Sequence, residues 1–183
     1  MTLDLAGAAD HEEVLRRVMW SIPTMLGVLG TVDASGDAHL MNISWVTPVA
    51  SNPVRLAAAV ETQSHSQANL TAVPKYTLSL LSLDQRALGR AFVKPDLDRD
   101  VVEGVELIAG YPVVRASAGT AYLADAHAVL AGSAQLLRDL GDHVLWLFEV
   151  ESVAAHVDVL DGPASDHSRR ALGVFDTRMN YGR

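Results

Sequence analysis

Residues 25–37 read Met25-Leu26-Gly27-Val28-Leu29-Gly30-Thr31-Val32-Asp33-Ala34-Ser35-Gly36-Asp37, an apolar run followed by a polar cluster. Residues 25–32 are mostly apolar, small or β-branched, which predicts a strand. Residues 33–37 are a cluster of turn-forming residues. Apolar residues resume at Ala38 and continue to Thr47 as a second strand, so the sequence predicts a β-hairpin.

The chain beyond this hairpin is also mainly predicted strand. After a turn at Ser51-Asn52-Pro53, strands are expected over residues 54–60, 76–81, 122–130, 144–153 and 171–175. Short helices are expected over residues 64–71 and 84–92. Residues 94–115 are charged and contain two prolines, which predicts a loop with one helical turn. Strands joined by short turns indicate a mainly β protein, an antiparallel barrel or sandwich.

Residues 10–20 predict a short amphipathic helix that lies on this β structure. Asp10 and Glu13 have the spacing of a capping box, and Pro23 ends the helix. The apolar face consists of Val14, Leu15, Val18 and Met19. No repeat or low-complexity tract divides the chain. We therefore expect a single domain, with residues 1–23 as helix and lead-in and residues 24–183 as the β body.

The composition argues against several classes of function. The chain has 183 residues and a net charge of −8, so it lacks the positive charge that attracts nucleic acids and anionic membranes. The absence of cysteine excludes disulfides, thiolate metal sites and cysteine nucleophiles. The apolar runs are far shorter than the ~20 residues of a membrane span, and Asp4 stands where a signal peptide is positive. We expect a cytoplasmic protein that binds neither nucleic acid nor membrane.

The motifs with the strongest chemical meaning are missing from the sequence. There is no G-x-G-x-x-G after a strand, no G-x-x-x-x-G-K-[ST] phosphate loop and no G-x-S-x-G nucleophile elbow. None of the seven histidines is paired as H-x-x-x-H or H-E-x-x-H, so no metal site is expected. The function must therefore be inferred from three weaker patterns.

The first pattern is Met41-Asn42-Ile43-Ser44-Trp45, where apolar and small polar residues alternate. A strand edge with free amides and carbonyls can hydrogen-bond the rim of a flat heteroaromatic ring. A plain half-buried strand shows the same alternation, so this pattern alone leaves both interpretations open.

The second pattern is Glu61-Thr62-Gln63-Ser64-His65-Ser66, where a predicted strand ends and a helix begins. Free amides and hydroxyls at a helix start suit a phosphate group, and an acidic chain has to bind anions through such local dipoles. The alternative is that Ser64 or Ser66 only caps the helix.

The third pattern is Gly141-Asp142-His143, a turn before the apolar strand over residues 144–153. An imidazole at the end of a strand can donate a hydrogen bond or carry a proton near neutral pH. A solvated histidine in a turn is the alternative interpretation.

The order and spacing of these patterns resemble the flavin reductase-like family, whose FMN-binding domain is a split β-barrel. In that family a strand of the type Met-Thr-Val-Ser-Ser precedes a Ser-x-x-Pro-Pro turn, a Ser-x-Thr helix start and, much later, Gly-Asp-His. The matching segments are Met41-Asn42-Ile43-Ser44-Trp45, Ala50-Ser51-Asn52-Pro53, Ser64-His65-Ser66, Asp84-Gln85-Arg86-Ala87-Leu88 and Gly141-Asp142-His143. The resemblance extends over residues 20–183.

The resemblance implies a mainly β fold, an antiparallel split β-barrel with short flanking helices, over residues 24–183, and a homodimer. It implies an NAD(P)H-dependent flavin reductase that passes a hydride from NADH or NADPH to FMN or FAD. A flavin-dependent monooxygenase is the partner that would take up the reduced flavin.

The resemblance also assigns residues by position. Asn42, Ile43 and Ser44 would face the flavin ring, with Met41 and Trp45 beside them as further cofactor-binding residues. The residues around the ribityl chain and phosphate would be Glu61, Thr62, Ser64 and Ser66, together with His65. His143 would lie near the nicotinamide or the flavin. Hydride transfer needs alignment and no acid or base, so His143 is expected to help in positioning without being indispensable.

Two other functions fit the same fold. A flavin-dependent oxidoreductase could act on its own organic substrate, with Trp45 and Pro48 shaping the pocket. A non-catalytic dimeric barrel could instead bind flavin or another ligand. Rapid bleaching of flavin by NADH alone identifies a reductase, whereas colourless protein that takes up no added flavin indicates the non-catalytic barrel.

Overall fold

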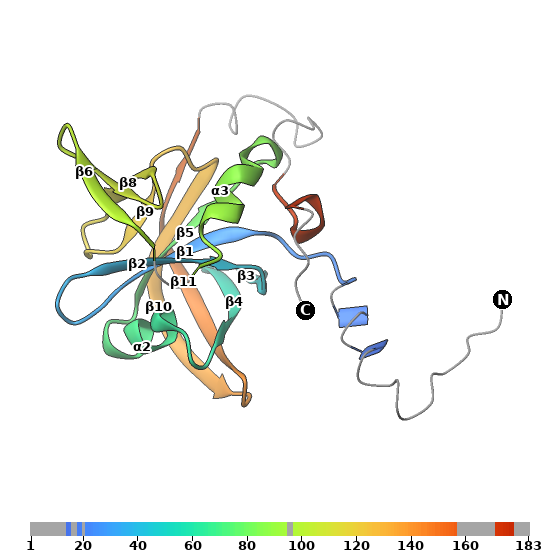
Figure 1. Ribbon diagram of the computed structural model, residues 1–183. Helices are drawn as coiled ribbons and strands as arrows, with labels where there is room; N and C mark the ends of the chain where they lie inside the picture. Colours follow the sequence, from blue (N-terminus) through green and yellow to red (C-terminus); the bar gives the residue numbers. More distant parts are fainter. Residues whose placement is uncertain (1–13, 16–17, 20, 95–96, 157–170, 178–183) are drawn as a thin grey trace.

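The computed structural model describes residues 14–15, 18–19, 21–94, 97–156 and 171–177. Figure 1 shows a mainly β protein, as the sequence predicts, with few and short helices. The strands form two sheets, and every pair of neighbouring strands is antiparallel. The prediction of a mainly β, antiparallel fold is therefore confirmed.

The larger sheet has seven strands in the order β2-β1-β5-β10-β11-β4-β3. In chain order these strands are β1 (Gly27–Val32), β2 (Ala38–Ile43), β3 (Val46–Ser51), β4 (Val54–Glu61), β5 (Lys75–Leu80), β10 (Ala128–Asp139) and β11 (His143–Ala155). The predicted hairpin is present, because β1 pairs with β2 from Gly27 opposite Ile43 to Val32 opposite Ala38.

The turn of this hairpin forms because its residues satisfy one another. The Oδ1 atom of Asp33 accepts hydrogen bonds from the backbone N–H of Ser35 at 2.8 Å and of Asp37 at 2.9 Å. Gly36 has a φ of 94°, a left-handed conformation that glycine adopts at little cost. The turn cluster read from the sequence therefore reverses the chain as predicted.

The edge strands of the larger sheet, β2 and β3, are consecutive in the chain and are joined only by Ser44 and Trp45. A flat sheet of this width would hold its edges roughly 29 Å apart, whereas such a short link spans only about 10 Å. The sheet therefore curls until its edges meet at this corner, although no β2–β3 ladder occurs in the described part of the chain. The single strand predicted over residues 38–47 is wrong, since it is broken at the corner.

Buried and exposed residues alternate along the strands, and the buried ones form the core on the inner face of the curled sheet. On β4, Leu56, Ala58 and Val60 are buried while their neighbours are more exposed. On β11, the same inward face carries Trp146 and Phe148. This face is apolar throughout, which is the pattern that fixes the register of the sheet.

The predicted helices are largely present. Residues 64–71 and 84–92 correspond to α2 (His65–Ala72) and to η1 (Leu83–Gln85) followed by α3 (Arg86–Ala91). The strand predicted over residues 171–175 is wrong, because the chain makes isolated bridges at Ala171 and Gly173 and then forms η3 (Val174–Thr177). No helix in the described part of the chain has the length and apolar character of a membrane span.

The N-terminal helix can be judged only in part, because residues 10–13, 16–17 and 20 lie outside the described residues. Val14, Leu15, Val18 and Met19 are helical, as predicted. These four side chains are 42–53% exposed. Their apolar face is therefore not covered by the described part of the protein.

The segment over residues 94–115 corrects the prediction of a loop with one helical turn. It forms β6 (Arg99–Val102), β7 (Val105–Ile108) and β8 (Tyr111–Arg115), which join β9 (Ala121–Leu123) in a four-stranded sheet. The strand predicted over residues 122–130 is likewise divided between β9 and the start of β10. The smaller sheet lies beside the β1–β2 hairpin (Figure 1).

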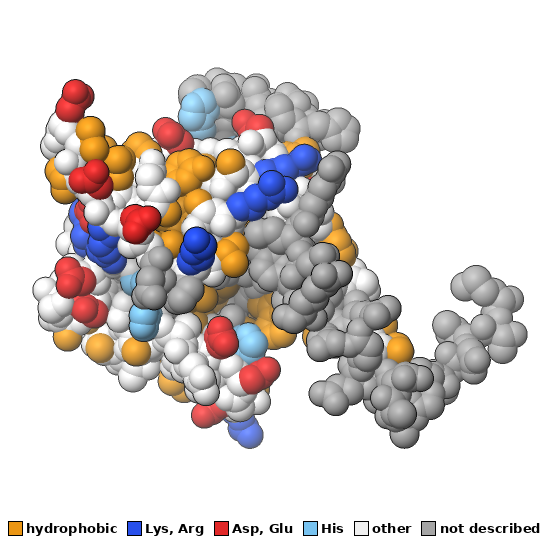
Figure 2. Space-filling model, in the orientation of Figure 1, with side chains coloured by type: hydrophobic (Ala, Val, Ile, Leu, Met, Phe, Trp, Pro, Cys, Tyr) orange, Lys and Arg blue, Asp and Glu red, His pale blue; other side chains and the backbone are white. Residues whose placement is uncertain are grey.

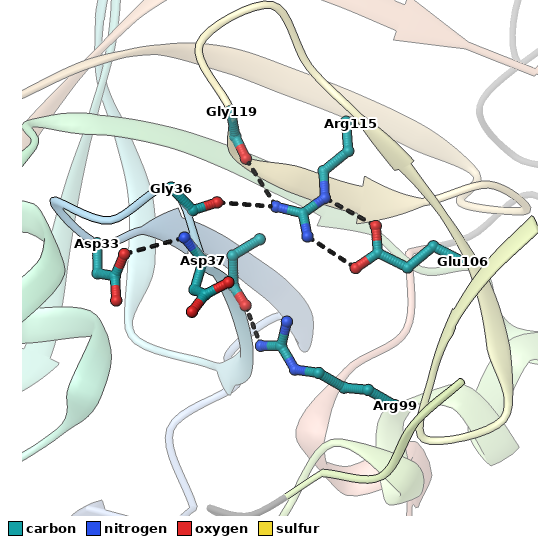
Figure 3. Close-up of polar contacts among 8 residues, drawn as sticks. Asp33, Gly36, Asp37, Arg99, Glu106, Arg115 and Gly119 are labelled. Atoms are coloured by element: carbon teal, nitrogen blue, oxygen red, sulfur yellow. Dashed lines mark hydrogen bonds and ion pairs between the residues drawn. The ribbon is translucent and has the colours of Figure 1, made fainter. Parts of the chain in front are cut away.

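Figure 3 shows how the smaller sheet is tied to that hairpin. Arg115 donates to both carboxylate oxygens of Glu106, at 2.8 Å from Nε and 2.7 Å from Nη2, which holds β7 to β8. Its Nη1 atom also donates to the carbonyl of Gly36 in the turn, at 3.3 Å. Arg99 of β6 donates to the carbonyl of Ala38. These contacts fix β6 next to the start of β2.

Candidate functional site

A cavity of about 540 Å³ opens beside β2, at the point where β4 ends and α2 begins. The residues predicted to bind a cofactor that line it are Met41, Asn42, Glu61, Ser64 and His65. The first two come from the first sequence pattern and the other three from the second. The fold therefore brings two patterns that are about twenty residues apart to one cavity.

The residues predicted to bind a cofactor make up only half of the cavity wall. His39, Gln63, Phe92, Val93 and Lys94 also line it. Residues 92–94 follow α3 and belong to no pattern, so only the tertiary fold brings them to β2. A hydrogen bond from the N–H of Asn42 to the carbonyl of Phe92, at 3.3 Å, joins this segment to the strand. His39 could have been suspected only because it lies two residues before Met41 and therefore on the same face of the strand.

The two polar atoms of the Asn42 side chain differ in their hydrogen bonding. Its Nδ2 atom donates to the carbonyl of Gly89 at 2.5 Å. Its Oδ1 atom is buried and has no hydrogen-bond partner among the described residues. A buried acceptor without a donor is costly and rare, and it suits a ligand that brings an N–H group.

The serines of the second pattern make internal hydrogen bonds. Ser64 is the N-cap of α2: its Oγ accepts from the N–H of Gln67 at 3.1 Å and donates to the carbonyl of Glu61 at 2.8 Å. Ser66 is fully buried, and its Oγ lies 3.4 Å from the donating hydroxyl of Thr31. The capping interpretation of Ser64 is therefore confirmed, whereas Ser66 is not among the described residues that line the cavity.

The second and third patterns are also in contact. The backbone N–H of Thr62 donates to the carbonyl of Asp142 at 2.9 Å, and its hydroxyl donates to the carbonyl of Gly141 at 2.8 Å. In the β4–β11 ladder, His143 lies opposite Glu61. The turn before β11 is thus fastened to the strand end that lines the cavity.

His143 is packed against the corner between β2 and β3. Its ring centroid lies 4.7 Å from that of Trp45, with 32° between the ring planes. Its Nδ1 atom lies 3.2 Å from a carboxylate oxygen of Asp142, without the geometry of a hydrogen bond. The histidine is partly buried in this position, so the interpretation as a freely solvated turn residue does not hold.

A second cavity, also about 540 Å³, lies on the other side of this corner. Its wall includes Trp45, Val46, Pro48, Ala59 and Leu145, and no charged side chain is among the described residues that line it. Of the other predicted residues, Ile43 is buried in the core, and Ser44 lies at the corner without lining either cavity. Trp45 and Pro48, which the sequence analysis expected to shape a substrate pocket, both line this apolar cavity.

Two imidazoles stand together at the polar cavity. The rings of His39 and His65 are 5.1 Å apart and meet edge to face. Burial, the nearby His65 and the charge of Arg99 lower the pKa of His39 to about 4. His39 is therefore neutral at pH 7 and presents one N–H donor. In the described part of the chain no three His, Asp or Glu side chains are grouped to hold a metal ion.

Solved structures share this fold at low sequence identity. The NADH:FAD oxidoreductase of Streptomyces globisporus C-1027 is 23% identical, with 86% of this chain and 84% of that chain covered at a TM-score of 0.64. The styrene monooxygenase flavin reductase of Pseudomonas putida S12 is 20% identical, with 77% and 86% covered at a TM-score of 0.64. A homologue of nitrilotriacetate monooxygenase component B from Mycobacterium thermoresistibile is 15% identical, with 97% and 94% covered at 0.68.

One further match covers only part of its counterpart. The chain spans 47% of the length of a Sinorhizobium meliloti 1021 protein, with 78% of this chain covered, 20% identity and a TM-score of 0.67. No curated protein matches the chain. Residues 19–174 match the family model described as flavin reductase like domain.

Proposed function

The chain belongs to the flavin reductase-like domain family, and on that premise we propose that it transfers a hydride from NADH or NADPH to FMN or FAD. When bound, the flavin supplies the redox chemistry, and the protein supplies binding, orientation and electrostatics. The observation that carries the proposal is that Asn42, Glu61 and His65, from two separate sequence patterns, line one cavity. His143, from the third pattern, lies opposite Glu61.

The polar cavity fits a flavin chemically. The rim of the flavin ring carries both N–H donors and carbonyl acceptors, and Asn42 offers a buried, unpartnered carbonyl oxygen. The volume of about 540 Å³ is within the range of small-molecule sites. Asn42 would hold the ring, with Met41 beside it, and Glu61, Ser64 and His65 would lie along the ribityl chain. Ile43, Ser44, Thr62 and Ser66 would support these residues from behind.

His143 would position the nicotinamide. Hydride transfer requires two rings to stack with their reacting atoms about 3–3.5 Å apart, which is a matter of alignment. Trp45 packs against one side of the imidazole and Asp142 lies beside its Nδ1 atom, so the ring is positioned at the corner to contact a second ring. Since no proton has to move in this step, His143 would act as a positioning residue.

We also propose the split barrel and the homodimer that the resemblance implies. The curl of the seven-stranded sheet and the meeting of its edges at Ser44 and Trp45 support a split barrel. The apolar face of Val14, Leu15, Val18 and Met19, which the described residues leave exposed, supports an interface with a second copy. A flavin-dependent monooxygenase is the proposed partner, because the matched Pseudomonas putida protein is the flavin reductase of such an enzyme.

Mixing the protein with FMN and NADH in a stopped-flow spectrophotometer without oxygen tests the proposal. We expect the absorbance of oxidised flavin near 450 nm to be lost at least ~100-fold faster than without protein. Flavin that binds but bleaches only after an organic substrate is added would support an oxidoreductase with its own substrate. Failure to bind FMN or FAD at all would reject both enzymatic functions.

Replacement of His143 tests its role within that reaction. For His143→Ala we expect kcat/KM for NADH to fall about tenfold, mainly through KM, because the ring that aligns the nicotinamide is lost. The Kd for FMN, measured by quenching of flavin fluorescence, should change less than about twofold. Unchanged turnover at limiting NADH would exclude this role.

A further inference from the structure

Thr62 follows the last residue of β4, and it differs from its chain neighbours in where it lies. Glu61 and Gln63 both line the polar cavity, whereas Thr62 is not among the described residues that do. The family pattern places Thr62 beside the ribityl chain and the phosphate. In this structure its hydrogen-bonding groups are occupied elsewhere, so its contribution to the site has to be indirect.

Both donors of Thr62 bond to the turn that precedes His143. The backbone N–H donates to the carbonyl of Asp142 at 2.9 Å, and the side-chain hydroxyl donates to the carbonyl of Gly141 at 2.8 Å. These two carbonyls belong to the two successive peptide groups between Gly141 and His143. Because each peptide group is planar, the two hydrogen bonds fix the orientation of the backbone that leads into His143.

The turn needs such restraint because packing does not supply it. Gly141 is exposed and has a φ of 103°, and a Cβ atom added there would meet nothing within 4 Å. Glycine adopts many backbone conformations at little cost when nothing packs against it. Inside the hairpin, the N–H of Leu140 donates to the carbonyl of His143 at 2.9 Å. That bond closes the turn on itself, whereas the bonds from Thr62 attach it to β4.

The imidazole of His143 depends on this backbone for its position. Its Nδ1 atom is buried and has no hydrogen-bond partner among the described residues. The Asp142 carboxylate lies 3.2 Å from that atom, but its side chain is 86% exposed and the two do not form a hydrogen bond. The backbone of residues 141–143 and the ring of Trp45 are therefore what places the imidazole.

The same strand also positions Trp45. The N–H of Ala59 on β4 donates to the carbonyl of Trp45 at 2.9 Å. Ala59 and Thr62 are three residues apart, so the two rings, 4.7 Å between centroids, are both attached to one end of β4. β4 is itself held by β3 on one side and β11 on the other. It thus sets the spacing of Trp45 and His143.

We propose that Thr62 is a positioning residue for His143. Its two hydrogen bonds hold residues 141–143 against the end of β4 and so keep the imidazole against Trp45, where it meets the nicotinamide. The contact with the nicotinamide rests on the proposed function, which this inference deepens. Thr62 acts through His143 and touches neither the flavin nor the nicotinamide.

Thr62→Val tests this role, because it removes the hydroxyl and keeps both the backbone N–H and the branched shape. We expect KM for NADH to rise about fivefold, the effect of one lost hydrogen bond, with kcat and the Kd for FMN each changing less than about twofold. Thr62→Ser restores a hydroxyl and should recover most of the loss. A wild-type KM in Thr62→Val would overturn the role.

Thr71→Val is the matched control. The Thr71 hydroxyl on α2 also donates to a backbone carbonyl, that of Gln67 at 2.9 Å, and Thr71 is exposed and not among the described residues that line the cavity. The same chemical change at this position should leave KM for NADH and the Kd for FMN as in the wild-type protein. An equal rise of KM in both variants would overturn the specific role of Thr62.

A double variant shows whether Thr62 acts through His143. If it does, Thr62→Val has nothing left to disturb once the imidazole is gone. We therefore expect Thr62→Val/His143→Ala to have the KM of His143→Ala within about twofold. Effects that multiply to about 50-fold would show two independent contributions and would overturn the inference.

NMR of the His143 ring separates this inference from the proposed function, because it needs no turnover. The imidazole proton signals are assigned from His143→Gln, and Trp45→Ala gives their positions without the neighbouring indole. We expect Thr62→Val to move the signals at least halfway toward those positions and Thr71→Val to leave them in place. Signals that stay unmoved in Thr62→Val make the positioning role wrong and leave the reductase proposal untouched. If they move while the wild-type protein reduces no flavin with NADH, the proposed function fails and the restraint of His143 by Thr62 stands.

Discussion

The two cavities have the same volume, about 540 Å³, and opposite chemical character. The polar one lies where β4 ends, and it takes Glu61 and His65 from that strand end and the helix that follows. The apolar one lies over the middle of the same strand, where Ala57 and Ala59 face outward. Charged and hydroxyl-bearing residues thus gather where strands end, and apolar side chains cover their centres.

The different linings of the two cavities suit them to different tasks. A cavity with convergent donors and acceptors fixes the orientation of a ligand, whereas an apolar wall excludes water and presses rings together. The segment from Met41 to Pro48 contributes to both, with Trp45 as the first residue on the apolar side. On the face of Figure 2, hydrophobic side chains are interspersed with acidic and basic ones, so neither kind of surface dominates there.

The largest expected effect on activity comes from replacement of Trp45, which belongs to the apolar cavity. Trp45→Ala removes the ring that stacks on His143 and enlarges the apolar cavity. We expect kcat/KM for NADH to fall about 30-fold, which corresponds to about 2 kcal/mol, while the affinities for FMN and riboflavin change less than about twofold. Steady-state kinetics with both flavins provide the measurement. Trp45→Phe, which retains an aromatic ring, should recover most of the loss, and equal loss in both variants would contradict the stacking role.

Replacement of Asn42 tests the polar side. Asn42→Ala removes the hydrogen bond to Gly89 and leaves that carbonyl without its donor. We expect the free energy of unfolding to fall by about 1–2 kcal/mol in urea denaturation, together with weaker binding of both FMN and riboflavin. Asn69→Ala is the control, because Asn69 bonds to Thr31 and does not line the cavity. A flavin affinity that falls equally in both variants would show that only stability is involved.

The smallest expected effect is a pH dependence of stability that comes from His39 in the polar cavity. The pKa of His39 is about 4 in the folded protein, below its ordinary value of 6.5. As the pH falls from 6.5 to 4, His39 becomes protonated in the unfolded chain but stays neutral in the folded protein. The free energy of unfolding therefore decreases in this pH range. We expect the wild-type protein to lose about 1 kcal/mol more between pH 7 and pH 5 than His39→Gln, after allowance for solvent screening.

Urea denaturation at both pH values measures this difference, and equal losses in the two proteins would contradict it.

The sequence predicted the parts of the fold that are set by local pattern. The β1–β2 hairpin follows from an apolar run and a turn cluster, and β11 from a continuous apolar segment. β6, β7 and β8 were missed because they lack that signal: all four residues of β6 are exposed, so no alternation marks it. The ion pair of Arg115 on β8 with Glu106 on β7 joins two of these strands, and pattern alone does not reveal such a contact.

The candidate site was predictable to a similar degree. The sequence indicated Asn42 and His65, since both lie in patterns at the ends of elements, and the structure places both at one cavity. It could not show that Ser64 and Ser66 make internal hydrogen bonds, because a cap and a ligand contact use the same residue type. Lys94 and Leu145 belong to no pattern, and only the curl of the sheet brings them to the two cavities.

The short link at Ser44 and Trp45 has a mechanical consequence. It limits the circumference of the curled sheet, because the edge strands β2 and β3 cannot separate further than the link allows. Only two residues separate Asn42 from Trp45, so we expect a shift of Asn42 on binding a ligand to displace Trp45 as well. Two ligands bound on opposite sides of this link are therefore expected to be coupled, each changing the affinity for the other by the same factor, whichever binds first.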